Sequence, residues 1–333
     1  MNPRRLLALA FAAALLLRSM PLVAQVRTGV PRIGILSSGT TPSGTDPDPD
    51  KGVLRGLREL GYVEGQTVRI ERRYAEGSPD RLALMAEELV RLKVDVILAG
   101  GPAAREAASK ATRSLPIVTI SGSDPVREGW AKALAQPGGN ITGLTVTFPG
   151  LVPKCLEFLK ESFPSIERVA LLLDASQLPD AKQLSEETEA AARLLKLKLE
   201  ILDVGGVNDF AAAFARAREL RIQAIFAIPT NTVVTHRSEL AALATRDRLL
   251  SISQFALLAH AGFLMTYGAD LDDLGRRAMI QVDKILKGAS PGDIPIEQPT
   301  KLNLTVNLKT AAAIGITLPQ SLLARADDLI QPR

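Results

Sequence analysis

Hydroxyl, amide, carboxylate and glycine residues follow most of the apolar runs of this chain. In the first half these residues are Ser37, Ser38, Gly39 and Thr40, then Gly100 and Gly101, then Ser121, Ser123 and Asp124. In the second half they are Asp174 and Ser176, then Thr230 and Asn231, then Ser253 and Gln254. Such groups form hydrogen bonds with a small polar solute, while apolar neighbours contact its body. The pattern predicts a binding site for a small molecule.

The residue types that perform covalent chemistry are sparse. His236 and His260 are the only histidines, and neither has a second histidine or a cysteine at metal-ligand spacing. A serine nucleophile would need a G-x-S-x-G turn, and the sequence contains none. Cys155 lies alone in the amphipathic stretch PKCLEFLKESF, which favours a buried apolar role. We therefore expect no catalytic residues, no metal and no cofactor.

Asp124 and Asp174 allow two interpretations. Two carboxylates that face each other could act as an acid and base pair in a hydrolase. Carboxylates at strand ends also serve as anchors for the ammonium group of a solute, and we favour this second role. A two-lobed α/β hydrolase remains the alternative function, together with a ligand-sensing domain.

The stretch VDVILAGGPAA, residues 94–104, ends an apolar strand with Gly100 and Gly101 and then becomes helical. It lacks the lysine and spacing of a Walker loop and the G-x-G-x-x-G fingerprint of dinucleotide-binding proteins. Two interpretations stay open: the glycines make only a tight turn, or their loop presents amides to a solute.

These residues need elements that carry them, and the first half of the chain alternates strands with helices. Strand patterns cover 32–38, 67–75, 94–101 and 115–122, and helical patterns cover 50–61, 79–93 and 103–112. This alternation predicts a parallel sheet with helices on both faces.

The same order returns in the second half. Residues 168–176, 195–206, 210–230 and 249–255 repeat the earlier pattern about 130 residues later. We expect two Rossmann-like α/β lobes. Since loops at the carboxyl ends of parallel strands carry binding groups, the candidate residues of the two lobes should face each other across a cleft.

The N-terminus has the layout of an export signal. MNPRR is followed by the apolar LLALAFAAALLL and a small-residue cleavage point after Ala24, so residues 1–24 are predicted to be a signal peptide. Of the 40 basic residues, three lie in this segment, which leaves 37 against 36 acidic ones. This near balance of charge gives no indication that the protein binds nucleic acid or an acidic membrane. We expect a soluble periplasmic protein without a membrane span after cleavage.

Several strings resemble those of a known family. The chain from about residue 31 to 330 is similar to ABC transporter substrate-binding proteins of the group that includes tryptophan-binding lipoproteins, which have the type I periplasmic-binding fold. The most specific strings are GYVEGQ, QPGGNITG and QPTKLNLTVNLKTA, with GFLMTYGADL and LLARADDLI in support. The resemblance implies a solute receptor that delivers its ligand to a membrane permease and its ATPase, without enzymatic activity.

Two loops depart from the family pattern. DASQLPD follows the first strand of the second lobe and IPTNTVVTHRS follows its third. Members that bind aromatic amino acids are therefore a poor guide to the solute, and Tyr267 is one of the few aromatic residues left for stacking. The acidic segment PSGTDPDPD after Thr41 either shapes the cleft mouth or is a surface loop.

The resemblance also implies lobe boundaries. We expect residues 30–146 with about 258–295 in the N-terminal lobe, and 147–257 with about 296–330 in the C-terminal lobe. Hinge strands are expected near 145–150, 255–265 and 290–300. At the first and third of these, the strings TFPGLVP and KGASPGDIP have the proline and glycine content of connectors between domains.

Overall fold

The computed structural model describes residues 29–39, 41, 50–122, 124–146, 150–178 and 181–332. The predicted signal peptide, the candidates Thr40 and Ser123, and most of the acidic segment after Thr41 lie outside these residues.

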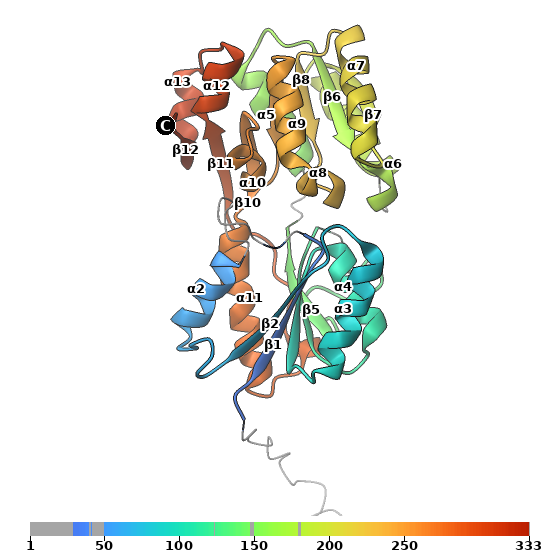
Figure 1. Ribbon diagram of the computed structural model, residues 1–333. Helices are drawn as coiled ribbons and strands as arrows, with labels where there is room; N and C mark the ends of the chain where they lie inside the picture. Colours follow the sequence, from blue (N-terminus) through green and yellow to red (C-terminus); the bar gives the residue numbers. More distant parts are fainter. Residues whose placement is uncertain are drawn as a thin grey trace, which may run out of the picture. The chain divides into compact units, whose positions relative to one another are not determined.

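Five parallel strands form the first sheet, in the order β2-β1-β3-β4-β5. They are β1 (Arg32–Ser37), β2 (Arg69–Tyr74), β3 (Val96–Gly100), β4 (Ile117–Ser121) and β5 (Ile141–Thr145). Helices α2 (Lys51–Glu59) and α11 (Leu271–Leu286) cover one face, and α3 (Pro79–Arg91) and α4 (Pro102–Ala111) cover the other (Figure 1). The central strands are buried on both faces, as parallel strands between helices must be.

Seven strands form the second sheet, in the order β12-β11-β10-β9-β8-β6-β7. They are β6 (Arg168–Leu173), β7 (Lys198–Asp203), β8 (Ala224–Ala227), β9 (Leu250–Ser253), β10 (Met265–Ala269), β11 (Leu302–Asn307) and β12 (Asp328–Ile330). Only the β10–β11 pair is antiparallel among these pairings.

Two helical layers enclose this second sheet. One layer contains α5 (Leu151–Ser162), α6 (Ala181–Leu194), α12 (Leu308–Ile314) and α13 (Gln320–Arg325). The other contains α7 (Phe210–Glu219), α8 (Asn231–Thr235), α9 (Arg237–Arg246) and α10 (Ala256–His260). Short 3-10 turns are η2 (Ala175–Gln177), η3 (Val207–Asp209) and η4 (Pro291–Asp293).

The predicted repetition of the two halves is confirmed by the strand order. Strands β7-β6-β8-β9-β10 stand in the same order as β2-β1-β3-β4-β5. The antiparallel β11 and the short β12 extend only the second sheet. The chain is therefore built from two doubly wound α/β sheets, as expected.

The two halves exchange segments. Strand β5 is followed by α5, which packs on the second sheet, while β10 is followed by α11, which packs on the first. Residues 258–269, expected in the N-terminal lobe, instead contribute to the second sheet because β10 pairs with β9 and β11. The second crossover therefore lies at Asp270, between β10 and α11, and not at 255–265.

The third crossover segment is attached to the first sheet. The Glu297 N–H donates to Gly143 O at 3.0 Å, and the Thr145 N–H donates to Glu297 O at 2.8 Å. The Glu297 carboxylate also accepts a hydrogen bond from Arg277 Nε on α11 at 3.1 Å. The Asp270 carboxylate accepts one from Asn303 Nδ2 at 3.0 Å, which links the second crossover to β11, the strand that follows the third.

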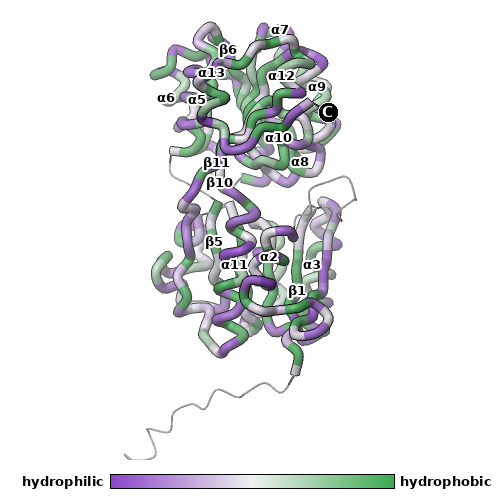
Figure 2. Tube along the Cα trace, turned by 90° about the vertical axis from the view of Figure 1, so that its left-hand side faces the viewer, coloured by the Kyte–Doolittle hydropathy of each residue, from purple (hydrophilic) through white to green (hydrophobic). Residues whose placement is uncertain are grey.

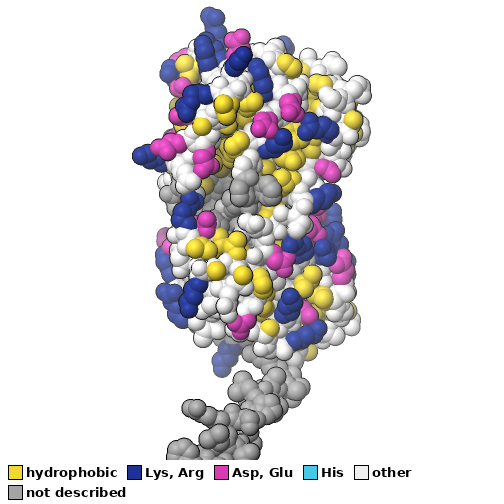
Figure 3. Space-filling view, turned by 180° about the vertical axis from the view of Figure 1, so that it is seen from behind, with side chains coloured by type: hydrophobic (Ala, Val, Ile, Leu, Met, Phe, Trp, Pro, Cys, Tyr) yellow, Lys and Arg dark blue, Asp and Glu magenta, His cyan; other side chains and the backbone are white. Residues whose placement is uncertain are grey.

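Hydropathy follows this layered arrangement. Apolar residues concentrate in the strands and on the helix sides that face them (Figure 2). On the surface seen in Figure 3, Lys and Arg are interspersed with Asp and Glu. Among the described residues, no helix has both the length and the apolar character needed to cross a bilayer.

Candidate ligand-binding site

The strand register brings the first-half candidates to one edge of the first sheet. Ser37 at the end of β1 pairs with Gly100 at the end of β3, and Gly100 pairs with Ile120 of β4. Ser121 follows Ile120 and pairs with Thr145. Ser37, Gly100 and Ser121 therefore lie at the carboxyl edge, where ligands of such sheets bind.

Gly101 and Gly100 play different roles. Gly101 has φ +89°, a value that favours glycine, and its N–H donates to Ile120 O at 2.8 Å. Gly101 therefore makes the turn into α4 while its amide belongs to the sheet. Gly100 is exposed at the strand end, and the nearest atom to an added Cβ would be Leu36 O at 3.7 Å.

Asp124 organises the loop after β4. Its Oδ1 accepts hydrogen bonds from the N–H groups of Val126 at 2.9 Å and Arg127 at 3.1 Å. The Arg127 guanidinium in turn donates to Gln183 Oε1 of α6 at 2.7 Å. Through Arg127, the loop that Asp124 organises therefore forms a hydrogen bond with the second half of the chain.

Asp174 follows β6 and is completely buried. Its Oδ1 accepts from the Ser176 N–H at 3.1 Å and the Ser176 hydroxyl at 2.5 Å. Its Oδ2 accepts from Gln177 Nε2 at 2.5 Å and from the Thr232 hydroxyl at 2.6 Å. This carboxylate is enclosed by donors of its own half of the chain.

Asn231 begins α8 and is reached by a candidate of the first sheet. The Ser38 hydroxyl donates to Asn231 Oδ1 at 2.9 Å, although 193 positions separate the two residues. The Asn231 N–H donates to Gln177 Oε1 at 2.9 Å. Thr230 caps the short helix by accepting from the Val233 N–H. The structure therefore joins the loop after β1 to the loop after β8.

The remaining second-half candidates differ in their surroundings. Ser253 is buried and donates to Ala227 O at 2.7 Å, so its hydroxyl serves the sheet. Gln254 is partly buried at the end of β9. The Tyr267 ring packs against Phe158 of α5 with centroids 4.5 Å apart, and Tyr267 lies with the apolar cluster under α5. In this arrangement, Tyr267 belongs to the packing of α5 on β10.

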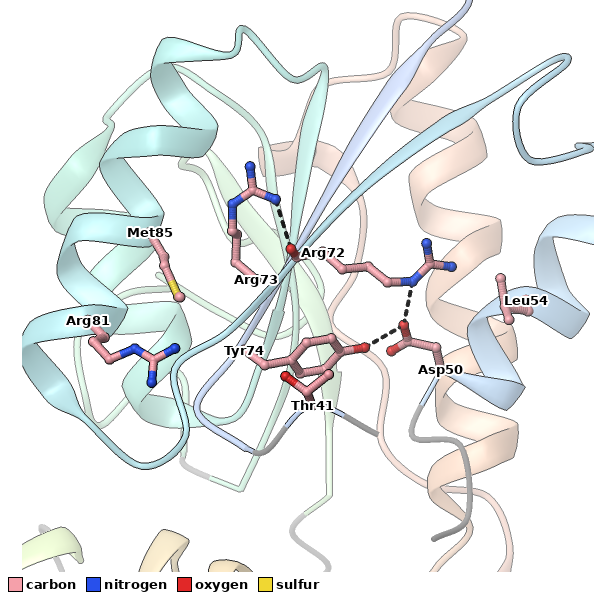
Figure 4. Close-up of a pocket in the computed structure, with 8 residues that line it drawn as sticks. All are labelled: Thr41, Asp50, Leu54, Arg72, Arg73, Tyr74, Arg81 and Met85. Carbon is pink, nitrogen blue, oxygen red and sulfur yellow. Dashed lines mark hydrogen bonds and ion pairs between the residues drawn. The ribbon is translucent and has the colours of Figure 1, made fainter. Parts of the chain in front are cut away.

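A pocket of about 580 Å³ adjoins the first-sheet edge. Its lining residues come from β2, α3, the start of α2 and, with Thr41, the segment between β1 and α2. Figure 4 shows them: Thr41, Asp50, Leu54, Arg72, Arg73, Tyr74, Arg81 and Met85. The buried Asp50 carboxylate accepts from the Tyr74 hydroxyl at 2.7 Å and from Arg72 Nε at 3.0 Å. The candidate Ser37 pairs with Tyr74, one of the lining residues of this pocket.

The arginines of this pocket are matched with carboxylates. Arg72 donates to Glu64 at 2.6 and 3.0 Å, and these hydrogen bonds lower the pKa of the Glu64 carboxyl. Arg73 donates to Glu88 at 3.0 and 2.8 Å, and Arg81 donates to Glu76 at 2.6 Å. The pocket therefore offers little uncompensated charge to a ligand, and we place the candidate site at the strand ends.

The described residues contain no group of three or more His, Cys, Asp or Glu side chains placed to hold a metal ion. The candidate groups at the strand ends are hydroxyls, amides and backbone groups. They can form hydrogen bonds with a solute and orient it.

Four residues of the site escaped the sequence reasoning: Arg127, Gln177, Gln183 and Thr232. Gln177 donates to the Thr232 hydroxyl at 2.7 Å and contacts both Asp174 and Asn231. Thr232 directly follows the candidates Thr230 and Asn231, so an extension of that loop by one residue would have included it. No feature of the sequence pointed to Arg127 and Gln183, because the hydrogen bond between them depends on how the folded chain brings α6 to the loop after β4.

Comparisons with known proteins agree with this architecture. The family model of the ABC transporter substrate binding protein matches residues 47–330. The tyrosine-binding protein of Clostridioides difficile (strain R20291) is 24% identical over 271 residues, which cover 80% of this chain and 76% of that protein.

Solved structures extend the likeness to the whole fold. A conserved domain protein from Vibrio cholerae is 25% identical with a TM-score of 0.81, over 90% of this chain and 100% of that one. An ABC domain from Streptococcus pneumonia in complex with L-Trp is 27% identical with a TM-score of 0.80, over 91% of this chain and 100% of that one. With its two doubly wound sheets and a family match over most of its length, this solute-binding chain belongs to the ABC transporter substrate-binding protein family.

Proposed function

We propose that this protein captures a small amino-acid-like solute between the carboxyl edges of its two sheets and delivers it to a membrane permease. The observation that carries the proposal is the Ser38–Asn231 hydrogen bond, which connects the loop after β1 to the loop after β8. The names of two relatives, one a tyrosine-binding protein and one solved with L-Trp, support an amino acid as the solute class.

The site residues of this proposal come from both sheets. Solute contacts are expected from Ser37, Gly39, Gly100, Gly101, Ser121, Ser123, Asp124 and Gln254, while Ser38 and Asn231 close the site through their mutual hydrogen bond. Asp174 and Tyr267 support the second-sheet loops from within, as their contacts indicate. Groups of this kind hold the polar ends of an amino acid by hydrogen bonds.

Closure about the crossovers would complete the site. Within the described part of the chain, two hydrogen bonds join the first-sheet loops to the second half: Ser38 to Asn231, and Arg127 to Gln183. Rotation near Val146, Asp270 and residues 298–301 would make and break these bonds, as in hinged solute receptors. The closed form would then be the one that the permease recognises.

We further propose that residues 1–24 are removed on export and that the mature protein works in the periplasm with a permease and its ATPase. It would bind its solute without converting it and without a cofactor. Sequencing the N-terminus of the protein purified from the periplasmic fraction tests the export step. A mature chain that starts near Gln25 supports it, and an intact N-terminus in the cytoplasm contradicts it.

A thermal-shift screen of the mature chain against the amino acids, with sugars and nucleosides as comparison sets, tests the binding function. A solute that binds only the native state, at a hundredfold excess over its Kd, stabilises it by about 2.7 kcal/mol. This corresponds to a rise in Tm of about 5 °C for a chain of this size. We expect such a rise with one or a few amino acids. No rise with any class, or consumption of a compound that binds, would contradict the proposal.

Trp130 provides an independent readout. It is the only tryptophan, its indole Nε1 is buried without a partner among the described residues, and it shares a loop with Arg127. Closure that strengthens the Arg127–Gln183 contact should therefore change its fluorescence. A titration that shifts Tm but leaves the emission unchanged would indicate binding outside the strand edges.

A further inference from the structure

The structure assigns Asp174 the role of a positioning residue that acts through Asn231 on the contact with Ser38. The inference rests on the proposed function, since it concerns the same strand-end site. It replaces the expected direct contact between Asp174 and a solute ammonium with an indirect role. Three observations carry it: the occupied carboxylate, the chain of hydrogen bonds to Asn231, and the contact with Ser38.

The Asp174 carboxylate has no capacity left for a solute. An ionised carboxylate accepts about four hydrogen bonds, and Asp174 receives four, from the N–H and hydroxyl of Ser176 and from the side chains of Gln177 and Thr232. Its side chain is fully buried. A solute ammonium would have to displace one of these donors, all of which belong to loops beside the proposed site.

The donors on Oδ2 transmit the position of Asp174 to Asn231. Gln177 and Thr232 both donate to Oδ2, and Gln177 also donates to the Thr232 hydroxyl at 2.7 Å. The carbonyl oxygen of the Gln177 side chain then accepts from the Asn231 N–H at 2.9 Å. The Gln177 amide is thereby held at both ends, which fixes its orientation and the start of α8.

The start of α8, held in this way, places Asn231 in contact with Ser38. Asn231 Oδ1 accepts the Ser38 hydroxyl at 2.9 Å, and both residues are partly buried. Because both partners are protein side chains, the free energy of this hydrogen bond does not depend on the chemistry of the solute. It favours the form in which the loops after β1 and β8 meet, and so it raises the affinity for every solute that requires that form.

A double-mutant cycle between Ser38→Ala and Asn231→Ala tests the contact. Solute affinity is measured by calorimetry for two amino acids that the unmodified protein binds, one of them with a cationic side chain if it binds one. A single neutral hydrogen bond contributes about fivefold to an equilibrium constant. We expect each variant to weaken binding by about fivefold and the double variant to weaken it by no more than either one alone, with the same factor for both solutes.

A second cycle tests Asp174. Asp174→Asn should weaken binding about three- to fivefold in the unmodified protein and should have no further effect in the Asn231→Ala background. Thr232→Val, which removes the hydroxyl at nearly constant volume, should behave like Asp174→Asn, while Thr232→Ser should restore the affinity. Ser109→Ala serves as the control, since Ser109 is a half-buried residue of α4 whose hydroxyl donates to Glu106 O of its own helix.

The outcomes separate the possibilities. Losses that multiply in the Ser38 and Asn231 double variant, or that differ between the two solutes, would show direct solute contacts and overturn the inference. A loss from Asp174→Asn that persists in the Asn231→Ala background, above all for a cationic solute, would restore Asp174 as the anchor.

The same cycle can be read without any solute. If no amino acid binds, the proposed function fails, and the coupling between Ser38 and Asn231 is then measured from the unfolding midpoints of the solute-free variants. Non-additive midpoints support the contact and the role of Asp174 in it. Additive midpoints for both cycles overturn it.

Discussion

Replacing Gly52 with alanine should separate α2 from α11. A Cβ at Gly52 would lie 2.1 Å from the carbonyl oxygen of Asp272 and 2.7 Å from its Cα, both backbone atoms of α11. Real Cβ contacts are essentially never shorter than 3.0 Å, so the two helices must move apart by about 0.9 Å at this point. Figure 1 shows that α2 lies along α11 at the side of the first sheet.

Two effects of opposite sign decide the result. Alanine gains up to about 1 kcal/mol of helix propensity over glycine. The forced displacement of two packed backbones costs about 1–3 kcal/mol, and the separation also loosens the packing of Val53 and Leu57, the buried apolar side chains of α2. We therefore expect a net destabilisation of about 2 kcal/mol and a Tm lower by about 4 °C.

Thermal unfolding followed by circular dichroism measures this difference. Gly139→Ala is the matched control, because Gly139 is exposed and an added Cβ meets no atom within 4 Å. The control should unfold within about 1 °C of the unmodified protein, since isolated surface changes are usually small. A Gly52→Ala variant that is as stable as the control would refute the reasoning about the close helix contact.

Other predictions concern buried or paired groups. Burial raises the pKa of the Cys155 thiol, so a thiol reagent at pH 8 should label it only after unfolding, and rapid labelling of the native protein would contradict its burial. Burial and the hydrogen bond donated to Asp283 raise the pKa of Tyr62 to about 12. Its unfolded value is about 10, so the neutral hydroxyl stabilises the fold below pH 10, and this contribution is lost as the pH rises through 12. The stability difference between the unmodified protein and Tyr62→Phe should shrink over that range in denaturant titrations, and a constant difference would contradict the bond. Glu128→Gln leaves the buried Arg105 without its ion partner at 2.8 Å and should lower the unfolding free energy by about 3 kcal/mol, whereas an unchanged value would show that the pair is dispensable.

Much of the fold was predictable because it depends on local patterns. The predicted strands 32–38, 67–75 and 168–176 contain β1, β2 and β6. Short apolar runs mark the buried strands β1 and β6, and alternation of residue types marks the edge strand β2. The repetition of these runs also predicted two sheets of equal strand order. The antiparallel β11 and the short β12 extend the second sheet, and the repetition did not predict them because the first half has no corresponding strands.

The side-chain partners were much harder to foresee. The sequence placed Ser37, Gly100 and Ser121 at strand ends, and the register brings them to one edge. It gave no sign that Asp174 would receive a hydrogen bond from Thr232, 58 positions away. Nor did it show that Tyr267 would pack on Phe158.

The crossover near residue 270 illustrates the same limit. The expected two-lobed architecture put a hinge at 255–265, but α10 and β10 continue the second sheet through Ala269. An added Cβ at Gly268 would lie 2.1 Å from Gln254 O, so this glycine permits the close approach of β10 to the end of β9. The point where the chain leaves one sheet for the other is set by strand pairing between distant residues, and local sequence patterns do not show it.

A crystal structure of the mature chain with the best amino acid from the screen tests the central claim most directly. The account predicts that the solute contacts the loops after β1, β3 or β4 together with the loops after β8 or β9, with Asp174 remaining bonded to Thr232 and Gln177. A solute that touches only one sheet, or that occupies the pocket around Asp50, Arg72 and Tyr74, would contradict it.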